Sequence, residues 1–205
     1  MSWNEFLRSP KRGAERAPTP TRVPEEESRP RSVQTRVVTR TYLEMRSFAE
    51  LRPSNLADVR CRFERIVNCP PSFYRFLYRE VGKSYHWRDR LAWSDEQIKA
   101  HVARADIAVW VMYRQGTPAG WFELQQHRDR SIEIVYFGLL PEYMGKGLGK
   151  HMLSATVEEA WATGAERVWL HTCSLDNPRA LPNYLKRGFR PYKEERYNVA
   201  IATDD

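Results

Sequence analysis

Cysteine is scarce in this sequence, and the few cysteines that occur form no recognisable motif. The chain has three, Cys61, Cys69 and Cys173, and no two of them have CxxC spacing. An odd number without paired spacing argues against a disulfide framework and against a structural zinc site. We therefore predict three unpaired thiols and no bound metal.

Long apolar runs are missing as well. No stretch of the chain reaches the roughly 18 consecutive apolar residues that a membrane-spanning helix needs. The first residues also lack the apolar core of a secretory signal peptide. From these two absences we predict a soluble protein that acts in the cytoplasm and has no membrane partner.

Apolar periodicity is absent from residues 1–36, which contain five prolines. This composition predicts a disordered basic tail. A mitochondrial targeting role is disfavoured, because Glu25, Glu26 and Glu27 contradict the acid-poor composition of transit peptides. Residues 37–205 are predicted to form a single domain, since a chain with 41% hydrophobic residues can bury a sizeable core.

Positive charge is in excess but is not concentrated. The formal net charge is +7; residues 1–36 hold eight Lys or Arg and five Glu, which contribute +3 and leave +4 for the other 169 residues. Nucleic-acid binding needs a clustered basic surface. We therefore expect no nucleic-acid partner, and contact with nucleic acid or the ribosome through the tail is the weakest alternative.

The pattern of apolar residues predicts strands and helices in the order of a mixed α/β fold. Ser72 is expected to cap a first helix, and Ser94 with Gln97 forms the capping box of a second. The turn RQGTP is expected to join two strands as a hairpin. The predicted strands cover residues 37–45, 107–113, 120–125, 131–140 and 167–173, with one or two more in 189–201; the predicted helices cover 73–81, 94–104, 148–163 and 178–186. The segment 46–68 is polar and charged, and no element is predicted in it.

The segment FGLLPEYMGKGLGKHML joins a predicted strand to a predicted helix through a glycine-rich turn. Gly145, Gly147 and Gly149 let the backbone approach an anion closely. The helix that follows directs its unpaired N–H groups and the positive end of its dipole to the same place. Lys146 and Lys150 add positive charge. The turn therefore predicts a phosphate-binding site.

A second segment, NPRALPNYLKRGF, follows after a predicted helix and strand. It fits the pattern N-x-x-A-x-x-x-Y with Asn177, Ala180 and Tyr184. The two segments, in this order, resemble those of the GNAT superfamily of acyl-CoA-dependent N-acyltransferases. The glycine turn resembles the acyl-CoA motif of that family, except that Met144 stands where Arg or Gln is usual.

The resemblance implies a GNAT fold, which is a central mixed and mostly antiparallel sheet with helices on both faces, and acetyl-CoA as the cosubstrate. Backbone around Phe137 and Leu139 is expected to pair with the pantetheine amides, and the Leu139 N–H to polarise the thioester oxygen. Asn177 is expected either to cap its helix or to bind the pantetheine. The pyrophosphate is expected on the turn formed by Met144, Gly145, Lys146, Gly147, Leu148, Gly149 and Lys150.

Acetyl transfer to an amine needs a neutral nucleophile. A lysine-like amine with a pKa near 10.4 is neutral in about 1 of 2,500 molecules at pH 7, a deficit of about 4.6 kcal/mol. Glu133 is predicted to be the general base, because it would share the face of Phe137 in a regular strand. Histone-type members of the superfamily carry a catalytic glutamate in a similar context, and Glu123 is the reserve. Tyr184, at the family's general-acid position, is expected to protonate the departing thiolate.

Taken together, these residues predict an N-acetyltransferase that moves an acetyl group from acetyl-CoA to a primary amine by direct attack. The alternative is a non-catalytic module that senses acyl-CoA, which the departure at Met144 motivates. The acceptor is expected to be a small molecule or a peptide, and the protein a monomer or a homodimer. The aromatic residues in 73–93 fit an acceptor pocket and a core lid equally well. His171 and Cys173 are interpreted as packing residues.

Overall fold

The protein is built on one seven-stranded sheet with the strand order β2-β3-β4-β5-β6-β1-β7. The structure, a computed structural model, describes residues 33–54 and 60–202. Neighbouring strands are antiparallel except β5 and β6, which are parallel. The predicted mixed, mostly antiparallel α/β fold is therefore confirmed. The strands are β1 (Val33–Met45), β2 (Cys61–Arg65), β3 (Ile107–Arg114), β4 (Thr117–Gln126), β5 (Ser131–Leu139), β6 (Arg167–Cys173) and β7 (Arg190–Ala202); the helices are α1 (Pro71–Gly82), α2 (Asp95–Val102), α3 (Leu148–Ala162) and α4 (Ala180–Lys186), with short 3-10 turns η1 (Phe48–Glu50) and η2 (Pro141–Tyr143).

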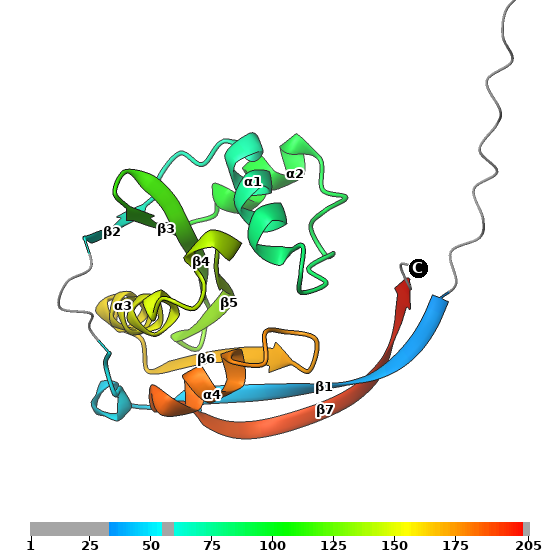
Figure 1. The fold of residues 1–205 in the computed structure, drawn as a ribbon. Coiled ribbons are helices and arrows are strands. Elements are labelled where there is room, and N and C mark those ends of the chain that lie inside the picture. Colours follow the sequence, from blue (N-terminus) through cyan, green and yellow to red (C-terminus); the bar gives the residue numbers. More distant parts are fainter. Residues whose placement is uncertain (1–32, 55–59, 203–205) are drawn as a thin grey trace, which may run out of the picture.

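Helices cover both faces of the sheet, as Figure 1 shows for α1 and α2 on one side of β3–β5 and α3 on the other. On the α3 side, Leu148, Met152 and Val157 are fully buried in one hydrophobic cluster with the sheet. On the other side, Leu77 of α1 and Ile98 of α2 are fully buried in a second cluster. Strand β5 lies between the two clusters, so its alternate residues face different environments. None of the described helices is long and apolar enough to span a membrane.

Most helices and strands lie where the local sequence patterns predicted them. Strand β6 has the predicted bounds, and Ser94 and Gln97 form the predicted capping box of α2. The hairpin between β3 and β4 turns on two residues, Gln115 and Gly116, with φ of 51° and 84°. Positive φ at both positions is the geometry of a two-residue type I′ turn, which matches the twist of the strands.

Three predictions about the first part of the chain need correction. The tail was predicted to run to residue 36, but β1 begins at Val33; residues 1–32 lie outside the described part. Ser72 is not a cap, because α1 begins at Pro71, whose missing N–H suits the first helical position. The polar segment 46–68, in which no element was predicted, contains β2, a short edge strand that pairs with β3 alone. Its charged residues Arg62, Glu64 and Arg65 leave an apolar pattern too short to detect.

Strand β5 contains an irregularity that changes which face its residues present. The pairing of β4 with β5 shifts between Glu123, opposite Tyr136, and Leu124, opposite Ile134, so that Val135 is an extra, bulged residue. Before the bulge Ile134 faces the α3 cluster; after it Phe137 does. Tyr136 packs in the opposite cluster with α1 and α2.

The bulge overturns one prediction about β5. Glu133 pairs with Gln125, two residues from the buried Glu123, and so lies on the α1 and α2 side of the sheet. Phe137 contacts the cluster on the α3 side. The expectation that Glu133 and Phe137 share a face is therefore wrong.

Gly188 fixes the end of α4 against η1. Its φ is +106°, and a Cβ at this position would lie 2.0 Å from the Glu50 carbonyl oxygen. Gly164 ends α3 with a similar φ of +82°, but a Cβ there would meet nothing within 4 Å. An alanine at Gly164 would meet only the cost of a left-handed backbone, whereas an alanine at Gly188 would meet this cost and a steric clash.

We predict that Gly188→Ala lowers the free energy of unfolding by about 2–5 kcal/mol, the sum of the backbone and overpacking costs. Gly164→Ala, the matched control, should lose only about 1–2 kcal/mol. Urea denaturation of both variants measures the difference. Equal losses would contradict the placement of η1 against the end of α4.

Candidate active site

A cavity of about 710 Å³ opens where β5 and β6 diverge. The two parallel strands pair only from Ser131 to Glu133 on β5 and from Arg167 to Trp169 on β6. Beyond these pairs the facing edges separate and leave backbone groups without a strand partner. The cavity walls come from the rest of β5, the glycine turn, the end of β6 and the loop to α4, the loop between α1 and α2, and the β1–β7 ribbon.

The glycine turn forms one end of the cavity. Gly145 and Gly147 have positive φ of 74° and 76°, and Gly147 caps α3 without any side-chain hydrogen bond to the helix. The first N–H groups of α3 therefore have no side-chain cap, which leaves them for an anion. Gly149 also lines the cavity, and a Cβ there would make only an ordinary contact, 3.7 Å from Leu139 Cδ1.

The other residues predicted for this turn lie in different environments. Lys150 and Met144 line the cavity. Lys146 does not belong to the cavity wall, because its Nζ donates to the Glu142 carbonyl at 2.7 Å. Leu148 is fully buried in the core. Of the predicted anion contacts, the structure thus brings Lys150 and the glycine backbone to the cavity.

The open edge of β5 supplies backbone hydrogen-bonding groups. Phe137 and Leu139 line the cavity, as predicted for residues beside a pantetheine arm. The Leu140 N–H donates to the Ala119 carbonyl at 3.0 Å, toward β4. Since antiparallel strands alternate the direction of their hydrogen bonds, the N–H and C=O of Leu139 point to the other edge, away from β4. An extended ligand could therefore pair with β5 where β6 has separated from it.

Tyr184 stands on α4 with its side chain in the cavity wall, only 7% exposed. Its ring packs edge-on against Phe137 and Phe189 at 6.2 Å between centroids. Burial, and secondarily the Asp176 carboxylate, raise the pKa of Tyr184, so the phenol keeps its proton. Asp176 is itself held, because Thr172 Oγ1 donates to its Oδ2 at 2.7 Å.

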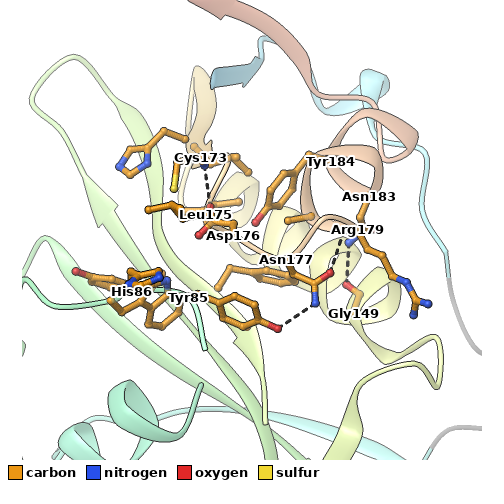
Figure 2. A pocket seen from close by; sticks show the side chains of 18 of the residues that line it. Tyr85, His86, Gly149, Cys173, Leu175, Asp176, Asn177, Arg179, Asn183 and Tyr184 are labelled. Atoms are coloured by element: carbon orange, nitrogen blue, oxygen red, sulfur yellow. Dashed lines mark hydrogen bonds between the residues drawn. The ribbon is translucent and has the colours of Figure 1, made fainter. Parts of the chain in front are cut away.

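Asn177 joins the two sides of the cavity. Figure 2 shows Cys173, Asp176 and Tyr184 on one side, with Tyr85 across from them. The Asn177 Nδ2 donates to the Tyr85 hydroxyl at 3.0 Å, and its Oδ1 accepts from a backbone N–H in the turn before α4. The Tyr85 hydroxyl also donates to Met144 Sδ at 3.3 Å. Asn177 therefore caps a turn and holds Tyr85; the cap position of α4 is Arg179.

The two glutamates considered as bases are both engaged elsewhere. Glu133 does not line the cavity, and its carboxylate contacts His127 Nε2 at 3.1 Å. Burial raises the pKa of Glu133. Glu123 is fully buried and bonded to Tyr74, Arg90 and His101. Burial alone would raise its pKa, but the His101 hydrogen bond and the Arg90 charge outweigh burial and lower it.

The Glu123 ion pair positions one wall of the cavity. Arg90 Nη1 lies 2.9 Å from both carboxylate oxygens of Glu123, and its guanidinium stacks 4.6 Å from the Tyr136 ring centroid. Arg90 lies in the loop between α1 and α2, which also carries the cavity residues Tyr85 and Trp87. Of the aromatic residues in 73–93, Tyr85 and Trp87 line the cavity, whereas Tyr74 and Tyr78 of α1 are core residues.

Sequence reasoning missed several cavity residues. His171 and Cys173 were interpreted as packing residues, yet both line the cavity. Arg40 and Tyr197 reach it from the β1–β7 ribbon, where the Arg40 Nη2 donates to the Tyr197 hydroxyl at 3.3 Å. The only local signal for His171 was its place on a strand beside the second motif. Nothing in the sequence around Arg40 or Tyr197 indicated a site.

Known proteins resemble this chain over most of its described part. Residues 72–189, more than half of the chain, match the family described as Acetyltransferase (GNAT) family. The mycothiol acetyltransferase of Corynebacterium efficiens is 28% identical over 115 residues, which are 53% of this chain and 38% of that protein. The chain thus spans well under half the length of this relative.

Solved structures share the fold. A GCN5-related N-acetyltransferase from Kribbella flavida superposes with a TM-score of 0.57 and 17% identity, over 83% of this chain and 61% of the other. One from Sphaerobacter thermophilus gives a TM-score of 0.59 and 12% identity, over 83% and 54%. At these identities the likeness extends to the fold alone.

We predict that Glu123→Gln lowers the free energy of unfolding at pH 7 by about 3 kcal/mol, because it leaves the buried Arg90 charge unpaired. The lowered pKa of Glu123 adds stability above about pH 4.3, the unfolded value, and this contribution is lost as the pH falls through the folded value. The difference in the free energy of unfolding between wild type and variant should therefore become smaller in acid. Urea denaturation at pH 7 and below pH 4 measures this difference, and Glu158→Gln, at an exposed position, is the control. A difference that does not change with pH would contradict the ion pair.

Proposed function

Because the chain belongs to the acetyltransferase (GNAT) family, we propose that it transfers an acetyl group from acetyl-CoA to a primary amine by direct attack on the thioester. The observation that carries the proposal is the single cavity between β5 and β6, which joins the uncapped N-terminus of α3 to the buried Tyr184. An anion site and a proton donor at two positions of one elongated cavity suit a ligand with a phosphate at one end and a reactive group at the other.

Groups along the cavity wall match the successive parts of acetyl-CoA. The N–H groups after Gly147, with Lys150 beside them, suit the pyrophosphate. Phe137 and Leu139 offer the backbone edge along which the pantetheine amides can pair. The pantetheine then runs toward the point where β5 and β6 meet, and the thioester lies there. The Leu139 N–H, or a backbone group freed by the bulge at Val135, would stabilise the oxyanion.

Tyr184 is proposed to protonate the departing thiolate. A phenol with a raised pKa stays protonated through the physiological range, so its proton is present when the thiolate forms on cleavage of the C–S bond. Its buried position beside Phe137 keeps it at a fixed place along the pantetheine path. The departure at Met144 removes one side-chain contact and leaves this chemistry intact.

Glu133 stays the predicted base by resemblance, with a raised pKa that would favour the role. Its carboxylate is turned to His127 and lies outside the cavity wall, so it would have to act through at least one intervening water. Glu123 is proposed as structural, because every side of its carboxylate is occupied. The acceptor is proposed to be a small-molecule or peptide amine and the protein to act in the cytoplasm as a monomer or homodimer.

We expect Tyr184→Phe to lower kcat by about 10²-fold, the usual contribution of a positioned acid, while leaving acetyl-CoA affinity unchanged. Thiol release over a panel of primary amines measures the first quantity and calorimetry the second. Tyr192→Phe, at an exposed position outside the cavity wall, is the control. Full activity in Tyr184→Phe would remove the acid role. Tight acetyl-CoA binding without turnover on any amine by the wild type would favour the acyl-CoA sensor instead.

Gly149→Ala tests the backbone cradle. The added Cβ has room within the protein, so the free energy of unfolding should not fall. The methyl group would stand where the pyrophosphate approaches the turn, and we expect the Kd for acetyl-CoA to rise at least about tenfold, or about 1.4 kcal/mol. S-acetylpantetheine, which lacks the pyrophosphate, should bind wild type and variant alike. An equal loss for both ligands would place the pyrophosphate elsewhere.

A further inference from the structure

His171 is a cavity residue that the proposed chemistry leaves unused. It lies on β6 two residues beyond Trp169, the last residue of β6 that pairs with β5. The side chain therefore stands just past the point where the two strands separate, at the inner end of the pantetheine path. It is exposed and lines the cavity.

The imidazole of His171 has free nitrogens. Its ring packs edge-on against Tyr42, its partner across β1, at 5.7 Å between centroids. No side-chain hydrogen bond joins it to any other residue in the described ranges. A packed ring with unengaged nitrogens facing a cavity is positioned but available, which is what a proton acceptor requires.

The charges around His171 favour its neutral form. Loss of hydration within the cavity walls lowers its pKa, and the positive charge of Arg40 acts in the same direction. Three carboxylates oppose this from other elements: Asp176 on the loop before α4, Asp89 on the loop before α2, and Glu195 on β7. The net effect is a His171 pKa below its ordinary value, so the imidazole is unprotonated at pH 7.

Three other groups that line the cavity, Cys173, Tyr136 and Asp176, are poorer acceptors. Burial raises the pKa of Cys173 and of Tyr136, which both stay protonated near pH 7. The Asp176 carboxylate accepts from the Thr172 hydroxyl and from the Cys173 N–H. Both hydrogen bonds engage Oδ2 of Asp176, whereas the ring nitrogens of His171 have no such partner among the described residues.

We propose that His171, in place of the Glu133 that the resemblance suggests, is the general base of this acetyl transfer, an assignment that rests on the proposed function and deepens it. A ring nitrogen of His171 accepts one proton from the acceptor ammonium, and the neutral amine forms the C–N bond with the thioester carbon. When the C–S bond breaks, Tyr184 gives its proton to the thiolate and regains one from the new, protonated amide. His171 then releases its proton to solvent, so the ammonium and acetyl-CoA yield the amide, CoA and one proton.

The decisive experiment compares two acceptors in the full-length protein. One is a primary alkylamine with a pKa near 10, and the other an aromatic amine with a pKa below about 5, which is already neutral at pH 7. His171→Gln should lower kcat/KM for the alkylamine by about 10²-fold or more and for the aromatic amine by less than about threefold. A merely structural role would lower both alike. His151→Gln, which removes an imidazole on α3 outside the cavity wall, should leave both rates unchanged.

The pH profile gives an independent readout. For the wild type with the alkylamine, kcat/KM should lose activity as His171 becomes protonated below about pH 6.5; this inflection should be absent in His171→Gln. If the Gln variant folds poorly, His171→Asn and an NMR titration of the wild-type imidazole decide the matter, with an expected midpoint below 6.5. A midpoint above 7 overturns the assignment.

The remaining outcomes separate this inference from the proposed function. Wild-type rates in His171→Gln with both acceptors overturn the base assignment while leaving acetyl transfer intact. An acceptor-dependent loss in Glu133→Gln in place of His171→Gln returns the role to Glu133. A wild-type protein that acetylates no amine at all overturns the proposed function, and the base assignment falls with it.

Discussion

The separation of β5 from β6 is the constraint on which the rest of this structure depends. Two parallel strands that share three residue pairs and then diverge leave two facing edges of unpaired N–H and C=O groups. Such groups need partners wherever water is excluded. Burying an extended ligand with amides of its own satisfies one edge, and the α3 N-terminus and Tyr184 lie along the same opening. The opening in the sheet is therefore the proposed ligand site.

Keeping this opening in shape requires rigid walls. The wall opposite β6 is a loop, and loops hold their position only when side chains anchor them. Here Arg90 reaches back from the loop to Glu123, inside the second core cluster. A buried ion pair is a costly way to gain stability, since desolvation offsets most of the attraction. The ion pair instead fixes the position of the loop that carries Tyr85 and Trp87. Asn177 holds Tyr85 from the other side.

Elements governed by local chemistry were predictable from the sequence. The bounds of β6, the capping box of α2 and the glycine turn before α3 all depend on residues within a few positions of one another. Strand β2 was missed for the opposite reason. Three of its five residues are charged, and it is a strand only because β3 offers an edge to pair with. An edge strand of this length is decided by its neighbour rather than by its own pattern.

The sequence by itself indicated the family, most of the strands and helices, and the glycine turn with Tyr184 after it, because each depends on short segments with fixed spacing. The tertiary structure decided which face each residue of β5 presents. One extra residue at Val135 moved Glu133 away from Phe137, since strand periodicity is two and a bulge inverts it. It also decided that His171 borders a cavity rather than a core. The cavity beside His171 exists because β5 and β6 separate there. This separation depends on both strands together, so neither segment of the sequence predicts it alone.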